Sequence, residues 1–226
     1  MPRPPNTRRL SDILGALFFF AAVVDSFQAR WDLALVALPL VLQNLLIAVA
    51  FLLRGPRAAG PTALRARLVA YAHGFMVAAF TDLSARFFPH WYAETSYVPV
   101  AAAGVVLYFF GVVLSLPALV ALRHAFSIEP QARELVTTGM YRWARHPIYA
   151  AYVVEYGGLL LWHLTVPFAL AYGTFLLLMW VRIREEEAVL ERAFPEYAAY
   201  RARVGMFGPK ARRRAAVAAR HELASS

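Results

Sequence analysis

Long runs without a formal charge are the feature that most constrains what this chain can fold into. Residues 33–53 and 95–122 contain no charged side chain, and residues 148–181 contain only one, Glu155. A helix needs about 20 consecutive apolar residues to cross the hydrocarbon core of a bilayer. Because the 226-residue chain is also 60% hydrophobic and only 16% charged, we expect a polytopic membrane protein.

The run over residues 148–181 is too long for a single membrane-spanning helix. Pro167 follows a turn predicted at residues 162–165, and proline suits the first turn of a helix, so we expect two short helices in a hairpin. The predicted fold class is all-α, a polytopic bundle of about six transmembrane helices with this late hairpin and a cytoplasmic C-terminal amphipathic helix. The expected spans are residues 10–28, 32–53, 66–88, 96–122, 147–163 and 165–183.

The basic residues indicate how such a bundle would lie in the membrane. Of the 23 lysine and arginine residues, only Arg30 and Arg86 fall in the expected outer segments. Positive charge collects on the cytoplasmic side of membrane proteins. We therefore expect a multi-pass protein of the inner (plasma) membrane with both termini in the cytoplasm. The first span could also be a signal peptide, but we expect it to be retained.

The net charge of +9 does not indicate a nucleic-acid partner. The basic residues follow the membrane topology and no nucleic-acid-binding motif accompanies them, so the expected partner is the lipid bilayer. The absence of cysteine excludes disulfides and thiolate chemistry, and no histidine–glutamate spacing is typical of a metal site, so no metal is expected. All but one of the 23 basic residues are arginine, a bias typical of bacterial proteins from GC-rich genomes.

Polar and aromatic residues gather in two pieces that flank the hairpin. The first piece runs from Arg123 to Pro147, and the second runs from Arg182 to Val204. A hairpin returns the chain to the same membrane face. We therefore expect His146 and Glu186 to be neighbours on the cytoplasmic side, although 40 residues separate them.

The first piece ends where a helix should begin. Gly139 allows a turn with backbone angles that other residues avoid, and Pro147 suits the first turn of the next helix. His146 then lies near the N-cap, where free N–H groups and partial positive charge can hold a carboxylate or a lone pair. Tyr149 follows three residues later and shares a face with His146. Aromatic rings such as Tyr141 could stack on a ligand or belong to the ordinary interfacial belt.

The second piece is rich in carboxylates. Arg182 and Glu186 are four residues apart and share a helix face. Glu186 and Glu187 could hold a ribose diol or an ammonium group, whereas Glu185 and Glu191 are expected on a solvated surface. An apolar stripe follows and predicts an amphipathic helix packed on the membrane face: Leu190, Phe194 and Tyr197.

Glu155 lies inside the expected fifth span, where an ionisable residue is by default a candidate for function. It could face the pocket, or it could pair with His73 or Asp82 of the third span. It could also make a structural hydrogen bond between helices. The sequence leaves these alternatives open.

The two polar pieces carry a family resemblance. The stretch "LVTTGMYRWARHPIY", followed after the hairpin by "RIREEEAVLERAFPEYAAYRARV", resembles the isoprenylcysteine carboxyl methyltransferase family and the related phospholipid methyltransferases. The resemblance covers residues 127–204. It implies an integral membrane enzyme that uses S-adenosylmethionine to methylate a lipophilic or small-molecule acceptor through a carboxylate, an amine or a thiol.

The resemblance also implies roles for individual residues. Arg182, which would orient the acceptor, and Glu186 are the expected catalytic residues. Arg145 or a helix N-terminus would hold the cofactor carboxylate. The residues that match the cofactor-binding pattern are Tyr141, Arg145, His146, Pro147, Tyr149, Glu186 and Glu187. The chain would then divide into N-terminal transmembrane helices (1–122), a methyltransferase-like region (123–204) and a basic, disordered tail (205–226).

Two other classes of protein stay open. An NADPH-dependent membrane reductase of the sterol-reductase type would have a similar histidine and tyrosine at the start of a late helix. The Asp/Cys and Lys-Tyr-Gly sequence elements expected in such a reductase are missing. A small membrane transporter would fit the polar or helix-breaking residues inside the spans: Pro39, Gln43, Asn44, Asp82 and Glu155. Most polar residues gather at one membrane face and not along a midplane path, which favours an enzyme.

Overall fold

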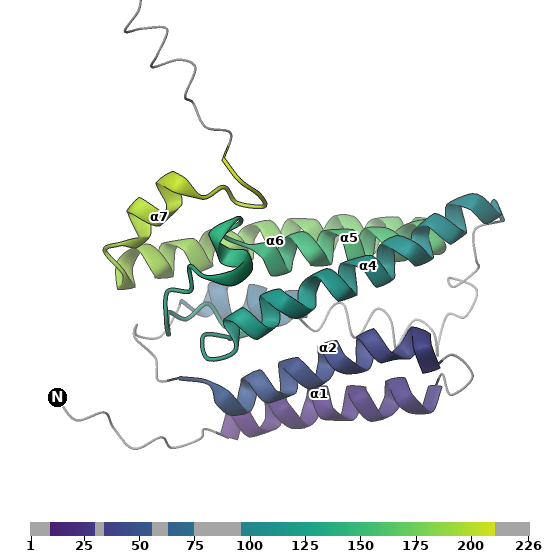
Figure 1. Ribbon diagram of the computed structural model, residues 1–226, viewed down its shortest axis with the longest axis horizontal. Coiled ribbons are helices and arrows are strands. Elements are labelled where there is room, and N and C mark those ends of the chain that lie inside the picture. The colour runs from purple at the N-terminus through teal and green to yellow at the C-terminus, as the bar shows by residue number, and fades with distance from the viewer. Residues whose placement is uncertain (1–9, 30–33, 56–62, 75–95, 211–226) are drawn as a thin grey trace, which may run out of the picture.

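The computed structural model describes residues 10–29, 34–55, 63–74 and 96–210. The long helices lie side by side along the long axis of the molecule, with α7 at one end (Figure 1). The named elements are α1 (Leu10–Ala29), α2 (Ala34–Leu53), α4 (Val98–Leu122), the 3₁₀ helix η3 (Gly139–Arg142), α5 (Pro147–Trp162), α6 (Val166–Ala193) and α7 (Tyr197–Arg203). Residues 64–74 form a further helical segment. The described residues contain two isolated β-bridges and no strand, which confirms a mostly helical fold.

The apolar runs of the sequence form helices close to the expected bounds. Two of these helices, α4 and α6, are long and apolar enough to cross a membrane. Both present large apolar side chains at the surface, such as Phe110 at 56% exposure and Leu170 at 68%. Such a surface is unfavourable in water and suits contact with lipid. The count of six spans stays a prediction, and most of the expected third span lies outside the described residues.

The most extensive helix packing joins α4 and α5. A Cβ atom on Gly111 of α4 would lie 2.4 Å from the backbone nitrogen of Glu155, and one on Gly158 of α5 would lie 2.3 Å from the backbone nitrogen of Tyr108. Only glycine lets two helix backbones approach so closely, and small residues serve this purpose where membrane helices meet. This packing fixes α5, and therefore the residues at its N-terminus, against α4.

The hairpin predicted from the long apolar run is present. Residues 163–165 join α5 to α6, and Pro167 lies in the first turn of α6. The helix α6 then continues without a break to Ala193, so the carboxylate-rich residues 182–193 form its last turns. The apolar stripe that follows packs on Tyr200 and Val204 of the C-terminal segment. A separate amphipathic helix lying on the membrane is therefore not confirmed.

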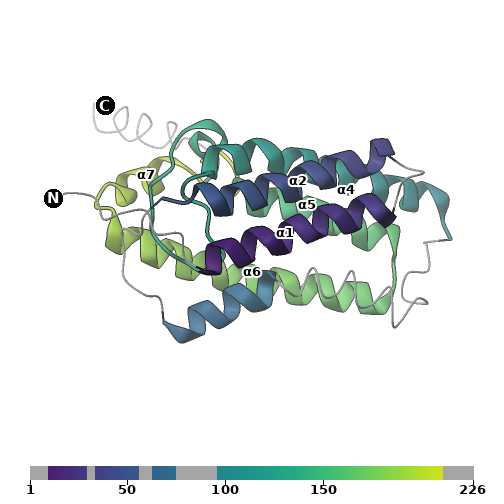
Figure 2. The same cartoon turned by 90° about the horizontal axis from the view of Figure 1, so that it is seen from below.

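The N-terminal helices support the loop that leads into α5. Gly139 has a φ angle of +58°, which glycine adopts without strain, and it begins η3 at the turn that the sequence indicated. Tyr141 of η3 packs in one apolar cluster with Phe51 of α2, Leu119 of α4 and Ile148 of α5. In Figure 2 the helices α1 and α2 lie in front of α4 and α5. The loop therefore rests on a core to which both halves of the chain contribute.

Candidate functional site

The hairpin brings the N-terminus of α5 beside the last turns of α6, at the α7 end of the molecule. The Nε2 atom of His146, the N-cap residue of α5, lies 3.2 Å from Oε1 of Glu187. The hydroxyl of Tyr149 donates a hydrogen bond to Oε1 of Glu186 at 2.5 Å. The expected proximity of the two polar pieces is therefore observed. His146, Tyr149 and Glu187 are each at most 7% exposed.

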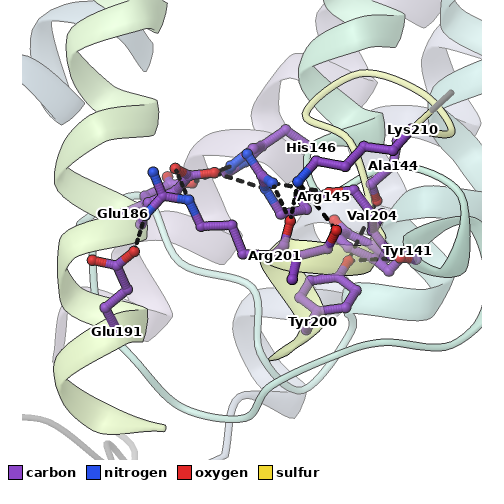
Figure 3. Close-up of polar contacts among 12 residues, drawn as sticks. Tyr141, Ala144, Arg145, His146, Glu186, Glu191, Tyr200, Arg201, Val204 and Lys210 are labelled. Atoms are coloured by element: carbon purple, nitrogen blue, oxygen red, sulfur yellow. Dashed lines mark hydrogen bonds and ion pairs between the residues drawn. The ribbon is translucent and has the colours of Figure 1, made fainter. Parts of the chain in front are cut away.

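Arg145 joins three elements of the site. Its Nε donates to Oε1 of Glu187 at 2.9 Å, and its Nη1 donates to the backbone carbonyls of Arg201 and Val204 at 3.2 and 2.9 Å (Figure 3). Those carbonyls lie at the C-terminal end of α7, where a cation also interacts favourably with the helix dipole. The guanidinium thus fixes α7 to α5 and α6. Its predicted role at the cofactor carboxylate stays a prediction.

The surroundings of Glu187 keep its side chain ionised. Burial alone would raise the pKa of this carboxyl, but the hydrogen bond from His146 and the charges of Arg145, His146 and Arg201 lower the pKa to about 2. Because a carboxylate can only accept hydrogen bonds, His146 donates to it through Nε2–H. The Nδ1 atom of His146 lies 4.0 Å from Oε2 of Glu186. The histidine ring therefore hydrogen-bonds to Glu187 and lies close to Glu186.

A C-terminal strap, which we define as Val204–Lys210, crosses the start of α5. The backbone N–H groups of Arg145 and His146 donate to the carbonyls of Gly205 and Met206, both at 2.9 Å. The strap turns back on itself through an antiparallel bridge between Val204 and Pro209. Residues 205–210 were expected in the tail, but they are ordered and contact the loop before α5 and the end of α7. The closely spaced glycines and the proline of this stretch are the signal that could have indicated an ordered turn.

Tyr200 of α7 attaches this helix to the loop before α5. Its hydroxyl donates to the carbonyl of Tyr141 at 2.6 Å and lies 3.5 Å from the carbonyl of Ala144. Burial raises the pKa of Tyr200 to about 12, and the charge of Arg145 opposes that rise, so the hydroxyl keeps its proton. The Lys210 ammonium also caps the carbonyls of Arg201 and Ala202 at 2.8 and 3.2 Å. No spacing in the sequence indicated these contacts.

A second polar cluster surrounds Arg182 of α6. The expected contact with Glu186, four residues later, is present at 3.0 Å from Nε to Oε1. The two terminal nitrogens of Arg182 reach Nδ1 of His73 at 3.3 Å and the carbonyl of Ser127 at 3.2 Å. The guanidinium carbon lies 5.6 Å from the centre of the Tyr149 ring. Arg182 therefore connects α6 to α5, to the loop after α4 and to the helical segment 64–74.

The remaining predicted cofactor residues, Tyr141 and Pro147, are buried next to these clusters and make no side-chain hydrogen bond with them in the described residues. Pro147 is fully buried as the first residue of α5, and Tyr141 is 7% exposed in the apolar cluster under the loop. The structure thus brings six of the predicted residues into two connected polar clusters: Arg145, His146, Tyr149, Arg182, Glu186 and Glu187.

Glu155 belongs to a separate polar contact between helices. Its Oε2 accepts a hydrogen bond from Nε2 of Gln43 in α2 at 3.0 Å, and the same nitrogen donates to Oγ of Ser115 in α4 at 2.9 Å. Of the open alternatives, the structure shows the interhelical hydrogen bond. His73 contacts Arg182 instead of Glu155, and Asp82 lies outside the described residues.

Residues 100–197 match the family model described as phospholipid methyltransferase. This segment is similar to the phospholipid methyltransferase family. The predicted resemblance is therefore confirmed, and the family indicates a membrane methyltransferase. No curated protein matches the chain.

The matched segment contains α4 from residue 100 onward, the hairpin and every predicted catalytic and cofactor residue. The strap and the helical segment 64–74, which carries His73, lie outside the matched residues. Both nevertheless contact the predicted site.

Proposed function

We propose that the protein is an integral membrane enzyme that transfers the methyl group of S-adenosylmethionine to a lipophilic or small-molecule acceptor. The observation that carries the proposal is the convergence of His146, Tyr149, Arg182, Glu186 and Glu187 at one end of the hairpin within a phospholipid methyltransferase segment. These side chains come from the two pieces of sequence that carry the family resemblance. Their acceptor and donor groups suit a ligand that is both polar and cationic.

The residues present fit S-adenosylmethionine. The carboxylate of Glu186, which already accepts hydrogen bonds from Tyr149 and Arg182, would bind a ribose hydroxyl or the ammonium group. The rings of His146 and Tyr149, 5.6 Å apart, offer faces for adenine and for the cationic sulfur. The first turn of α5 would bind the cofactor carboxylate through its N–H groups, since Arg145 is engaged with Glu187 and α7.

When bound, this cofactor supplies an electrophilic methyl group on a sulfonium. A nucleophilic atom of the acceptor forms the new bond to the methyl carbon as the carbon–sulfur bond breaks, so the site must align the two reactants. Arg182 is suited to orient the acceptor, because Glu186 and Ser127 hold its guanidinium from two sides. The buried pair of Arg145 and Glu187 would keep His146 and α7 in the geometry that the cofactor requires.

The proposal includes a membrane topology. The six spans expected from the sequence would put the α7 end of the molecule and both termini on the cytoplasmic side of the inner membrane. The cofactor would then enter from the cytosol, where it is soluble. The acceptor would reach the same site from the bilayer, along the apolar helices.

The decisive test is calorimetric binding of S-adenosylmethionine to the purified protein in detergent. The three adjacent glutamates of α6 provide matched variants, because Glu185 forms an ion pair with the exposed Arg65 of the helical segment 64–74 and not with the candidate site. We expect Glu186→Gln and His146→Ala to weaken binding at least about tenfold and Glu185→Gln to leave it unchanged. Absence of binding to the folded wild type would refute the proposal, and binding of NADPH instead would indicate the reductase class.

A further inference from the structure

His73 is a buried side chain in contact with the candidate site, although it comes from the N-terminal half of the chain. It is only 3% exposed. Its ring stacks on Phe175 of α6 at a centroid distance of 4.9 Å and meets the edge of Tyr149 at 6.0 Å. Two aromatic contacts and a contact with Arg182 hold the ring, so its orientation is well defined.

The contact with Arg182 determines which ring nitrogen of His73 carries the proton. Nη1 of Arg182 lies 3.3 Å from Nδ1 of His73. A guanidinium only donates hydrogen bonds, so Nδ1 must accept with its lone pair. The ring is then neutral and its hydrogen sits on Nε2. His73 thus presents a single N–H donor on the side away from Arg182.

That donor has no hydrogen-bond partner within the described part of the chain. A buried donor left without a partner costs roughly 1–3 kcal/mol, and native proteins leave few of them. Such an atom beside a reaction site is therefore expected to meet a ligand group.

The part of α6 that His73 contacts indicates which ligand the histidine meets. Phe175, on which the ring stacks, precedes Glu186 by eleven residues, a rise of about 16 Å along the helix toward its apolar part. His73 lies between this apolar part and the groups suited to the polar cofactor, because it also contacts Arg182 and Tyr149, which both donate to Glu186. His73 therefore lies on the side of the site from which a lipophilic acceptor would approach.

We propose that Nε2–H of His73 donates a hydrogen bond to an oxygen of the methyl acceptor, next to the atom that is methylated. This inference rests on the proposed methyltransferase function. A bond to the nucleophilic lone pair itself would slow methyl transfer, so the partner is a second, non-reacting oxygen. The cation of Arg182 nearby favours an anionic oxygen, which a lipophilic carboxylate or the phosphate of a phospholipid would supply.

The first measurement determines the protonation of the His73 ring by NMR and does not depend on enzymatic activity. In protein labelled with ¹⁵N-histidine, the His73 signals are assigned by their loss in His73→Phe. We expect Nδ1 to be unprotonated and Nε2 to be protonated in the wild type. A proton on Nδ1 would overturn the inference.

The second measurement compares transfer of labelled methyl from S-adenosylmethionine by wild type, His73→Phe and His73→Gln in lipid nanodiscs. The phenylalanine keeps the ring stacking, the glutamine amide restores an N–H donor, and His124→Phe, at an exposed position, is the control. The acceptors are a total bacterial lipid extract, oleate, phosphatidylethanolamine and oleylamine, which lacks an anionic oxygen.

We expect His73→Phe to raise KM for the acceptor at least about tenfold, with cofactor affinity unchanged within about twofold and partial recovery in His73→Gln. Preference for oleate or for phosphatidylethanolamine identifies the source of the oxygen. Equal methylation by wild type and His73→Phe would overturn the proposed role of His73. So would a loss of activity in His73→Phe that is as large with oleylamine as with the oxygen-containing acceptors. Neither result would contradict the proposed methyltransferase function. Failure of the wild type to bind the cofactor or to label any lipid would instead refute the proposed function.

Discussion

Replacing Glu187 with glutamine tests whether the buried charge cluster holds the site together. Glu187 accepts hydrogen bonds from Arg145 and His146, and the side chains of Arg145 and Glu187 are each 7% exposed. Hydrogen bonds to a charged group contribute about 1.5–3 kcal/mol each, whereas neutral ones contribute about 1 kcal/mol. Glutamine keeps the shape and a neutral acceptor, so we expect a loss of about 2 kcal/mol in the free energy of unfolding.

The matched control is Glu191→Gln, on the same helix. Glu191 pairs with Arg201 at the surface, where the two side chains are 43% and 48% exposed. An exposed ion pair contributes about 0–1 kcal/mol, so this variant should differ little from the wild type. Unfolding of the detergent-solubilised protein by sodium dodecyl sulfate, followed by tryptophan fluorescence, measures both values.

The loss in Glu187→Gln should also depend on pH. The pKa of Glu187 is about 2 in the folded protein against an ordinary value of 4.5. A lowered pKa contributes stability that is complete above about pH 4.5 and declines as the pH falls toward 2. The wild type should therefore lose its advantage over Glu187→Gln between pH 5 and pH 3. An advantage that is constant over this range, or no advantage over the Glu191→Gln control, would refute the reasoning.

Two further predictions concern glycines. Gly158→Val should destabilise the α4–α5 packing by about 2 kcal/mol or more, because a Cβ there lies 2.3 Å from the backbone nitrogen of Tyr108. Gly173→Ala, with nothing within 4 Å of its Cβ, is the control in the same unfolding assay. Gly205→Val should displace the strap, because a Cβ there lies 2.3 Å from the carbonyl oxygen of Gly208, and should weaken binding of S-adenosylmethionine. Gly208→Ala should bind the cofactor like the wild type, and equal affinities of both variants would show that the strap does not support the site.

Those features of the fold that follow from local rules were predictable from the sequence. The hairpin followed from the length of one apolar run and the position of Pro167, because hydrophobic length and proline act locally. The contact of Arg182 with Glu186 followed from helical spacing alone. Once the hairpin is in place, the proximity of His146 and Glu187 requires only that its two ends return to the same side.

Contacts that depend on tertiary structure could not be predicted in the same way. Arg145 matched a cofactor-binding pattern, but its hydrogen bonds go to Glu187 and to carbonyls at the end of α7, which no spacing indicates. His73 contacts a residue 109 positions away, through helices whose relative rotation the sequence does not specify. The partner of Glu155, Gln43, is equally remote in the chain. In each case the rotation of one helix against another selects the partner.

The unbroken course of α6 has a mechanical consequence. At 1.5 Å per residue its 28 residues extend for about 42 Å, while the hydrocarbon core of a bilayer is about 30 Å thick. Glu186 and Glu187 therefore lie near one end of a rigid helix whose apolar part is long enough to cross the membrane. A thinner bilayer would increase the tilt of α6. The two carboxylates would then move relative to His146, which is held in place because α5 packs closely on α4. If the protein spans the membrane as proposed, the thickness of the bilayer would act on the geometry of the candidate site.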